Sequence, residues 1–82
     1  MYELWDSESL NMVDSFGSVA EVESAIAATI ALSGVGAITP LVLVREDENG
    51  ETETVAEGGA ILVATRRLLA VEQAATNQSR SA

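Results

Sequence analysis

With 82 residues, the chain is long enough for one domain with a single core, close to the size at which such a core becomes marginal. It contains no Cys and no His, and all 4 of its basic residues are arginines, against 13 acidic residues and a formal net charge of -9. These absences exclude disulfides, thiolate nucleophiles, histidine bases and Schiff-base lysines. The sequence therefore predicts no catalytic residue, no cofactor and no metal site. The negative charge disfavours binding to nucleic acid and favours binding to a basic protein partner.

The first predicted elements form a β-hairpin. Residues 2–6 alternate in polarity and include Tyr and Trp, which is typical of a strand. After three turn-favouring residues, residues 11–16 indicate the returning strand. Because Tyr2 and Leu4 point away from the side that carries Trp5, both faces of the first strand present a large apolar side chain.

A helix follows the hairpin. Ser18 and Glu21 match a capping box, in which the Ser hydroxyl accepts from the Glu21 amide while the Glu21 side chain reaches back. Gly34 stands where a glycine would end the helix. Apolar or small side chains recur on one predicted face between these signals, namely Val22, Ala25, Ile26, Thr29, Ile30 and Leu32.

A second hairpin is predicted between two breaks in the pattern. Residues 41–44 are four consecutive apolar residues, and residues 52–57 form the returning strand. Asn49-Gly50 between them is a strong turn signal, with Gly50 expected in the left-handed conformation.

The loop length of this hairpin decides its register. A two-residue turn would set Glu46 opposite Glu53, which is an unfavourable pair of like charges. A three-residue loop instead sets Arg45 opposite Glu53 and Leu43 opposite Val55, and this register is preferred.

Gly58-Gly59 ends the last strand, and a second helix is predicted from Ala60 onward. Its apolar residues follow a heptad-like stripe, Ile61, Ala64, Leu68, Val71 and Ala75. The prediction is a single α+β domain over residues 1–76, in the order ββαββα, with a flexible polar tail over residues 77–82. The four strands would form a largely antiparallel sheet with both helices on one face.

Residues 25–44 carry no charge and are long enough to span a bilayer. Gly34, Gly36 and Pro40 interrupt any helix there, and the flanks are acidic, so no membrane association is expected. No signal-peptide pattern follows Met1, and the predicted location is the cytoplasm.

Two groups of acidic residues could supply carboxylates for chemistry. Residues 47–51 resemble a calcium loop in composition, but the ligand spacing fails, and a solvated hairpin tip is predicted. Glu3, Asp6 and Glu8 offer carboxylates for hydrolysis but no concave pocket to hold a sugar. A carboxylate metal-binding module stays a less favoured alternative.

The surplus of apolar surface predicts a partner. Residues 41–44 need burial on both faces, whereas two helices cover only one face of the sheet. A second copy is the simplest cover, so a homo-oligomer, with a dimer favoured, is expected through the sheet or the last helix. The candidate interface residues are Trp5, Val42, Val44, Ile61, Leu68 and Val71.

The predicted function is a non-enzymatic, small acidic interaction or regulatory protein. The alternative is an acidic, antitoxin-like or decoy inhibitor of a basic partner protein.

Several segments together give the chain a characteristic pattern, namely Tyr2-Glu3-Leu4-Trp5-Asp6, Asn11, Phe16, the helix at Glu21, Leu43-Val44-Arg45-Glu46-Asp47, Asn49-Gly50 and Ala56-Glu57-Gly58. This pattern resembles a group of short bacterial proteins found mostly in GC-rich genomes. The resemblance covers roughly residues 2–62. It implies the ββαββα order and, because no activity is attached to the group, no functional residue.

Overall fold

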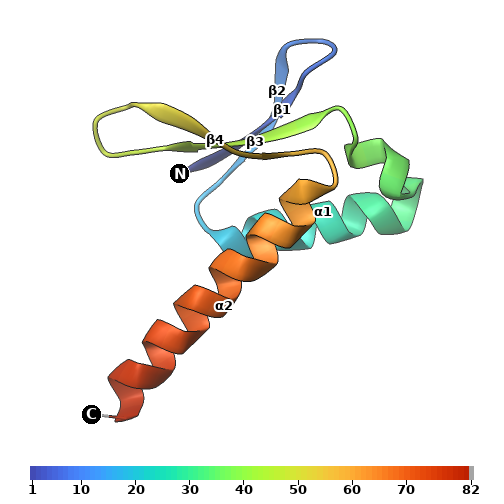
Figure 1. Cartoon of the computed structure of the whole chain (residues 1–82). Coiled ribbons are helices and arrows are strands. Elements are labelled where there is room, and N and C mark those ends of the chain that lie inside the picture. The colour runs from blue at the N-terminus through green and yellow to red at the C-terminus, as the bar shows by residue number, and fades with distance from the viewer. Residues whose placement is uncertain (82) are drawn as a thin grey trace.

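A four-stranded antiparallel sheet carries two helices on one of its faces (Figure 1). The computed structural model describes the backbone of residues 1–81 and the side chains of residues 1–75. The elements in chain order are β1 (Tyr2–Asp6), β2 (Asn11–Phe16), α1 (Val19–Ser33), the 3₁₀ helix η1 (Val35–Ile38), β3 (Leu41–Glu46), β4 (Thr52–Glu57) and α2 (Ala60–Ser81).

The sheet order is β2-β1-β3-β4, with every neighbouring pair antiparallel. The predicted α+β fold and its ββαββα order are therefore confirmed. The predicted flexible tail, residues 77–82, lies outside the residues whose side chains are described.

The β3–β4 hairpin confirms half of the predicted register. The loop has three residues closed by a hydrogen bond from the Asp47 amide to the Glu51 carbonyl (2.8 Å), and Gly50 has a φ of 81°. Arg45 lies opposite Glu53, and their side chains form an ion pair at 2.6 Å. Such an exposed pair contributes little to stability.

The predicted pairing of Leu43 with Val55 is wrong. The register shifts by one residue between Leu43 and Val44, and Leu43 lies opposite Ala56 instead. Val55 is the extra residue of a β-bulge. The bulge lets Val55 and Ala56, which are consecutive, both pack against the hydrophobic core.

Both predicted caps of α1 form. The Ser18 hydroxyl accepts a hydrogen bond from the Glu21 amide (3.3 Å), and the Gly34 amide donates to the Ile30 carbonyl (2.8 Å). The Glu21 carboxylate reaches back one residue further than predicted, to the amide of Gly17 (2.8 Å). These contacts satisfy backbone groups that a helix leaves unpaired at its ends.

Replacing Ser18 by Ala is therefore expected to lower the free energy of unfolding by about 1 kcal/mol, because the amide of Glu21 loses its acceptor. Urea denaturation followed by circular dichroism measures this loss. Ser24→Ala is the matched control, since Ser24 is exposed within α1 and Ala favours the helix there. An equal loss in both variants would contradict the capping role.

The core lies between the helices and the sheet. Its buried members come from both helices, η1 and the two central strands, namely Leu4, Val22, Ile26, Ile38, Leu41, Leu43 and Ile61. Leu32 was predicted on the apolar face of α1, but its side chain is 86% exposed. Leu32 follows Ile30 by two residues, which places the two side chains about 200° apart around the helix, so Leu32 points to solvent. Ile38 of η1, which the sequence did not indicate, packs in the core instead.

Helix α2 leaves the sheet as it proceeds (Figure 1). Ile61 and Thr65 near its start are fully buried, and the Thr65 hydroxyl donates to the Leu62 carbonyl (3.0 Å). Leu68 is partly buried, and Val71 is 67% exposed. The predicted stripe thus begins in the core and ends in solvent. Within the described residues, no helix is long and apolar enough to cross a membrane.

Candidate interaction surface

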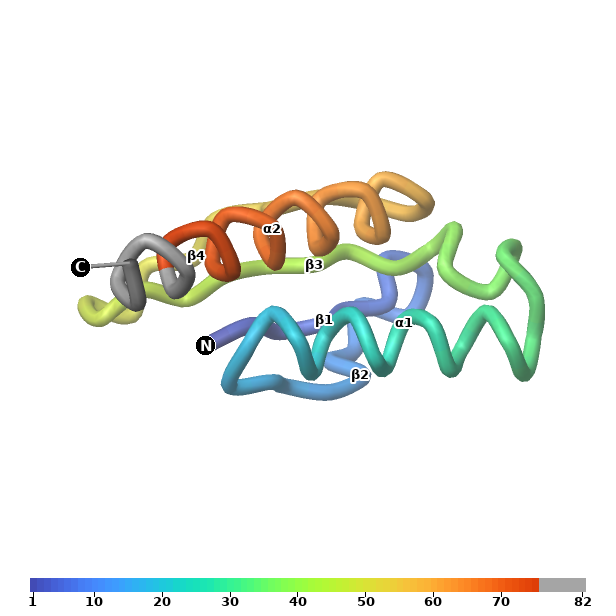
Figure 2. The backbone as a smooth tube through the Cα atoms, turned by 90° about the horizontal axis from the view of Figure 1, so that it is seen from below, coloured from blue at the N-terminus to red at the C-terminus, as the bar shows by residue number. Residues whose placement is uncertain are grey.

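The face of the sheet opposite the helices is not covered by any element of the chain, as seen in Figures 1 and 2, where both helices lie on the other side. Strand pairing places apolar side chains together on it, because residues opposite one another share a face. Trp5 lies opposite Met12 on β2 and Val42 on β3. We call this surface the open face and define its apolar centre as Trp5, Leu10, Met12, Val42 and Val44.

The apolar centre forms an open groove of about 510 Å³. Its lining includes Trp5, Leu10, Val42 and Val44. The indole Nε1 of Trp5 donates a hydrogen bond to Oε1 of Glu3 (3.2 Å). Since the polar atom of the indole already has a partner, the ring offers mainly hydrocarbon surface to anything that enters the groove.

Leu10 reaches the groove from the β1–β2 turn and is not among the residues predicted from the sequence. Its backbone has a φ of 61°, which is unusual for a residue other than glycine, and its side chain is 78% exposed. The turn is held by hydrogen bonds from the Leu10 amide to the Asp6 carbonyl (2.8 Å) and from the Ser7 hydroxyl to the Pro40 carbonyl (2.7 Å). A left-handed leucine has no sequence signature, so only the structure could place it here.

Carboxylates surround the apolar centre. Glu3 lines the groove, and Glu46 and Glu57 share the same face because they lie opposite Thr52 and Val42 in the register. At one end the N-terminal ammonium of Met1 donates to the main-chain carbonyl oxygen of Glu46 (3.5 Å). We call Glu3, Glu46 and Glu57 the carboxylate rim.

The described arginines lie elsewhere. Arg45 is on the face that carries the helices, where it pairs with Glu53. Arg66 and Arg67 are exposed on α2, on the far side of the sheet from the open face. Among residues 1–75, therefore, no arginine side chain neutralises the carboxylate rim.

The structure divides the six predicted interface residues among three places. It brings Trp5, Val42 and Val44 together on the open face. Ile61 is fully buried in the core, so its prediction as an interface residue is corrected: its apolar side chain already packs within the same chain. Leu68 and Val71 lie on the part of α2 that leaves the sheet.

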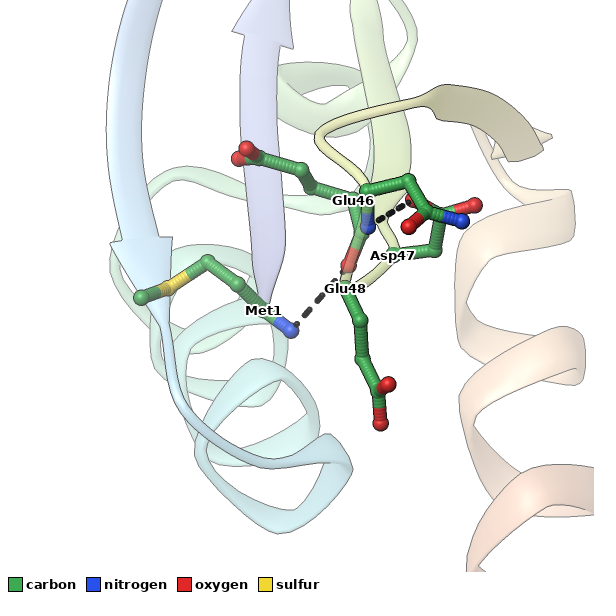
Figure 3. A pocket seen from close by; sticks show the side chains of 5 residues that line it. Met1, Glu46, Asp47 and Glu48 are labelled. Atoms are coloured by element: carbon green, nitrogen blue, oxygen red, sulfur yellow. Dashed lines mark hydrogen bonds between the residues drawn. The ribbon is translucent and has the colours of Figure 1, made fainter.

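A second hollow, of about 630 Å³, lies between Met1 and the β3–β4 turn (Figure 3). The carboxylates of Glu46 and Glu48 point away from one another there. The Asp47 carboxylate accepts two backbone hydrogen bonds within the turn, at 2.8 and 2.9 Å. Within the described residues, no group of three or more carboxylates is arranged to hold a metal ion. The Asp47 carboxylate therefore stabilises the β3–β4 turn.

The fold and the open face together define an α+β domain with one uncovered, carboxylate-rimmed sheet surface. No protein-family model, no curated protein sequence and no solved structure matches the chain.

Proposed function

We propose that the protein is a non-enzymatic interaction protein that self-associates through its open face. The observation that carries this proposal is the grouping of Trp5, Val42 and Val44 on the side of the sheet that neither helix covers. Burying apolar side chains of this size against a second copy removes them from water, which is the main driving force for association.

The dimensions of the open face favour a weak, reversible dimer. Four strands spaced by about 4.8 Å and six residues rising about 3.3 Å each give a face of roughly 20 by 20 Å. That extent is at the low end for specific protein interfaces. The copies would exchange readily, as in a regulatory protein rather than a permanent assembly.

The carboxylate rim sets the sign of the salt dependence. Two open faces packed together would bring two sets of carboxylates near each other, and each chain carries a net charge of -9. Salt screens this repulsion over about 8 to 10 Å. Added salt should therefore strengthen the dimer.

Light scattering over a range of protein concentrations, at low and high salt, tests the proposal. The unmodified protein is expected to approach the mass of a dimer, and to do so at lower concentration in high salt. Val44→Asp is expected to stay monomeric, because it places a further carboxylate in the apolar centre. Circular dichroism verifies that this variant is folded.

Val71→Asp is the matched control, since Val71 is exposed on α2 and away from the open face. This variant should dimerise like the unmodified protein. Loss of the dimer only in Val71→Asp would assign association to α2. A monomer under every condition would refute self-association altogether.

A further inference from the structure

We propose that the open face also binds a basic, amphipathic helical segment of another protein, which displaces the second copy. This inference shares only the location of the binding surface with the proposed function. Its basis is the combination of an apolar groove with a rim of one sign of charge and no neighbouring arginine side chain among the described residues. A second copy buries the apolar groove but brings its own carboxylates against the carboxylate rim. A basic segment buries the groove and also places positive charge beside the rim.

The rim lies at both ends of the apolar centre along β3. Glu46 stands at one end, and Glu57, which lies opposite Val42, stands at the other. Val42 and Glu46 are four residues apart, so these two carboxylates are separated by about 13 Å. A helix rises about 1.5 Å per residue, so basic side chains seven positions apart lie on one face and about 10.5 Å from each other, and their own length lets them reach both ends.

The groove sets what lies between those basic residues. The side chains of Trp5, Leu10, Val42 and Val44 offer an apolar floor, which suits two or three large aliphatic side chains on one helical face. The expected partner helix therefore carries a basic residue, apolar residues about one helical turn further along, and then a second basic residue. An acidic helix with the same apolar stripe would meet the rim with like charge and should be rejected.

The two associations respond to salt in opposite directions. Salt weakens the attraction between the carboxylate rim and a basic segment, whereas it relieves the repulsion between two copies. Low salt should therefore favour the heterologous complex and high salt the dimer. This difference in sign separates the two associations in one set of solutions.

The probe is a synthetic Lys/Leu amphipathic peptide without Trp, compared with a twin in which Glu replaces every Lys. Trp5 is the chain's only tryptophan and lies in the groove, so its fluorescence reports directly on the open face. Titrations use the full chain at a concentration where light scattering gives a monomer. The basic peptide is expected to shift the Trp5 emission, with an affinity that falls about tenfold or more between low and high salt.

Two charge-matched variants locate the binding. Glu46→Gln combined with Glu57→Gln removes two rim carboxylates and is expected to lower the affinity for the basic peptide about five- to tenfold. Glu48→Gln combined with Glu51→Gln removes the same charge from the β3–β4 turn and should change the affinity less than about twofold. Circular dichroism verifies that both variants fold.

Equal weakening by the two variant pairs, or equal binding of the acidic twin, would overturn the inference. Absence of any Trp5 response, with the dimer unchanged at high peptide concentration, would assign the open face to a second copy alone and leave the proposed function intact. A chain that never dimerises but binds the basic peptide as described would refute the self-association, and with it the displacement, and would support binding of the basic segment alone.

Discussion

Replacing Leu43 by Ala is expected to lower the free energy of unfolding by about 3 kcal/mol. Leu43 is fully buried at the centre of the sheet, where β3 pairs with both β1 and β4. Removing its side chain leaves a cavity beneath α1 and α2 that the surrounding strands cannot close without losing their register. A domain of this size has only about 5 to 10 kcal/mol of stability, so the loss is a large fraction of the total.

Val44→Ala is the control for this prediction, since Val44 is the next residue of the same strand but lies on the open face and is only partly buried. Its loss should be below about 1 kcal/mol in dilute, monomeric protein. Urea denaturation followed by circular dichroism gives both values. Equal losses in the two variants would mean that the helices do not cover the face assigned to them.

Replacing Gly58 by Ala is expected to cost about 2 kcal/mol of stability. Gly58 has a φ of 56°, where a side chain is strained. An added Cβ would also lie 3.2 Å from the carbonyl oxygen of Thr39. The obstruction is backbone, which cannot rotate away. The Gly58 amide meanwhile donates to the Leu41 carbonyl (2.8 Å), so moving the chain would break this link between β3 and the start of α2.

Gly59→Ala provides the comparison for Gly58→Ala. Nothing lies within 4 Å of a Cβ added at Gly59, and its φ is not in the left-handed region. Its stability should change by less than about 0.5 kcal/mol. The two adjacent variants can be measured together by thermal and urea unfolding. A similar loss in both would show that flexibility before α2, rather than the close approach to Thr39, makes glycine necessary.

Local signals predicted both ends of α1 and the turn between β3 and β4, because the residues that cap a helix or close a turn act through their nearest neighbours. Ser18 accepts from an amide three residues away, and Gly50 adopts its left-handed turn within the hairpin that it closes. Neither effect depends on the rest of the fold. The pairing of Arg45 with Glu53 follows for the same reason, since it is fixed by the length of the loop.

Features set by distant contacts were not predicted. The bulge at Val55 exists because the core accepts both Val55 and Ala56, which no spacing rule in β4 could indicate. Ile61 begins a regular apolar stripe, and the sequence could not show where that stripe passes from the core into solvent. The open face was predicted from the apolar run of β3, whereas the contribution of Leu10 and the arrangement of the rim required the turn and the register.

The departure of α2 from the sheet divides the helix into two mechanical parts. Up to Thr65 its backbone can open only if the core opens, because Ile61 and Thr65 are fully buried. From residue 66 to residue 75 no side chain is fully buried, so the amides there can exchange with solvent through local fraying. The second part of the helix can therefore melt and reform while the sheet and its open face stay intact.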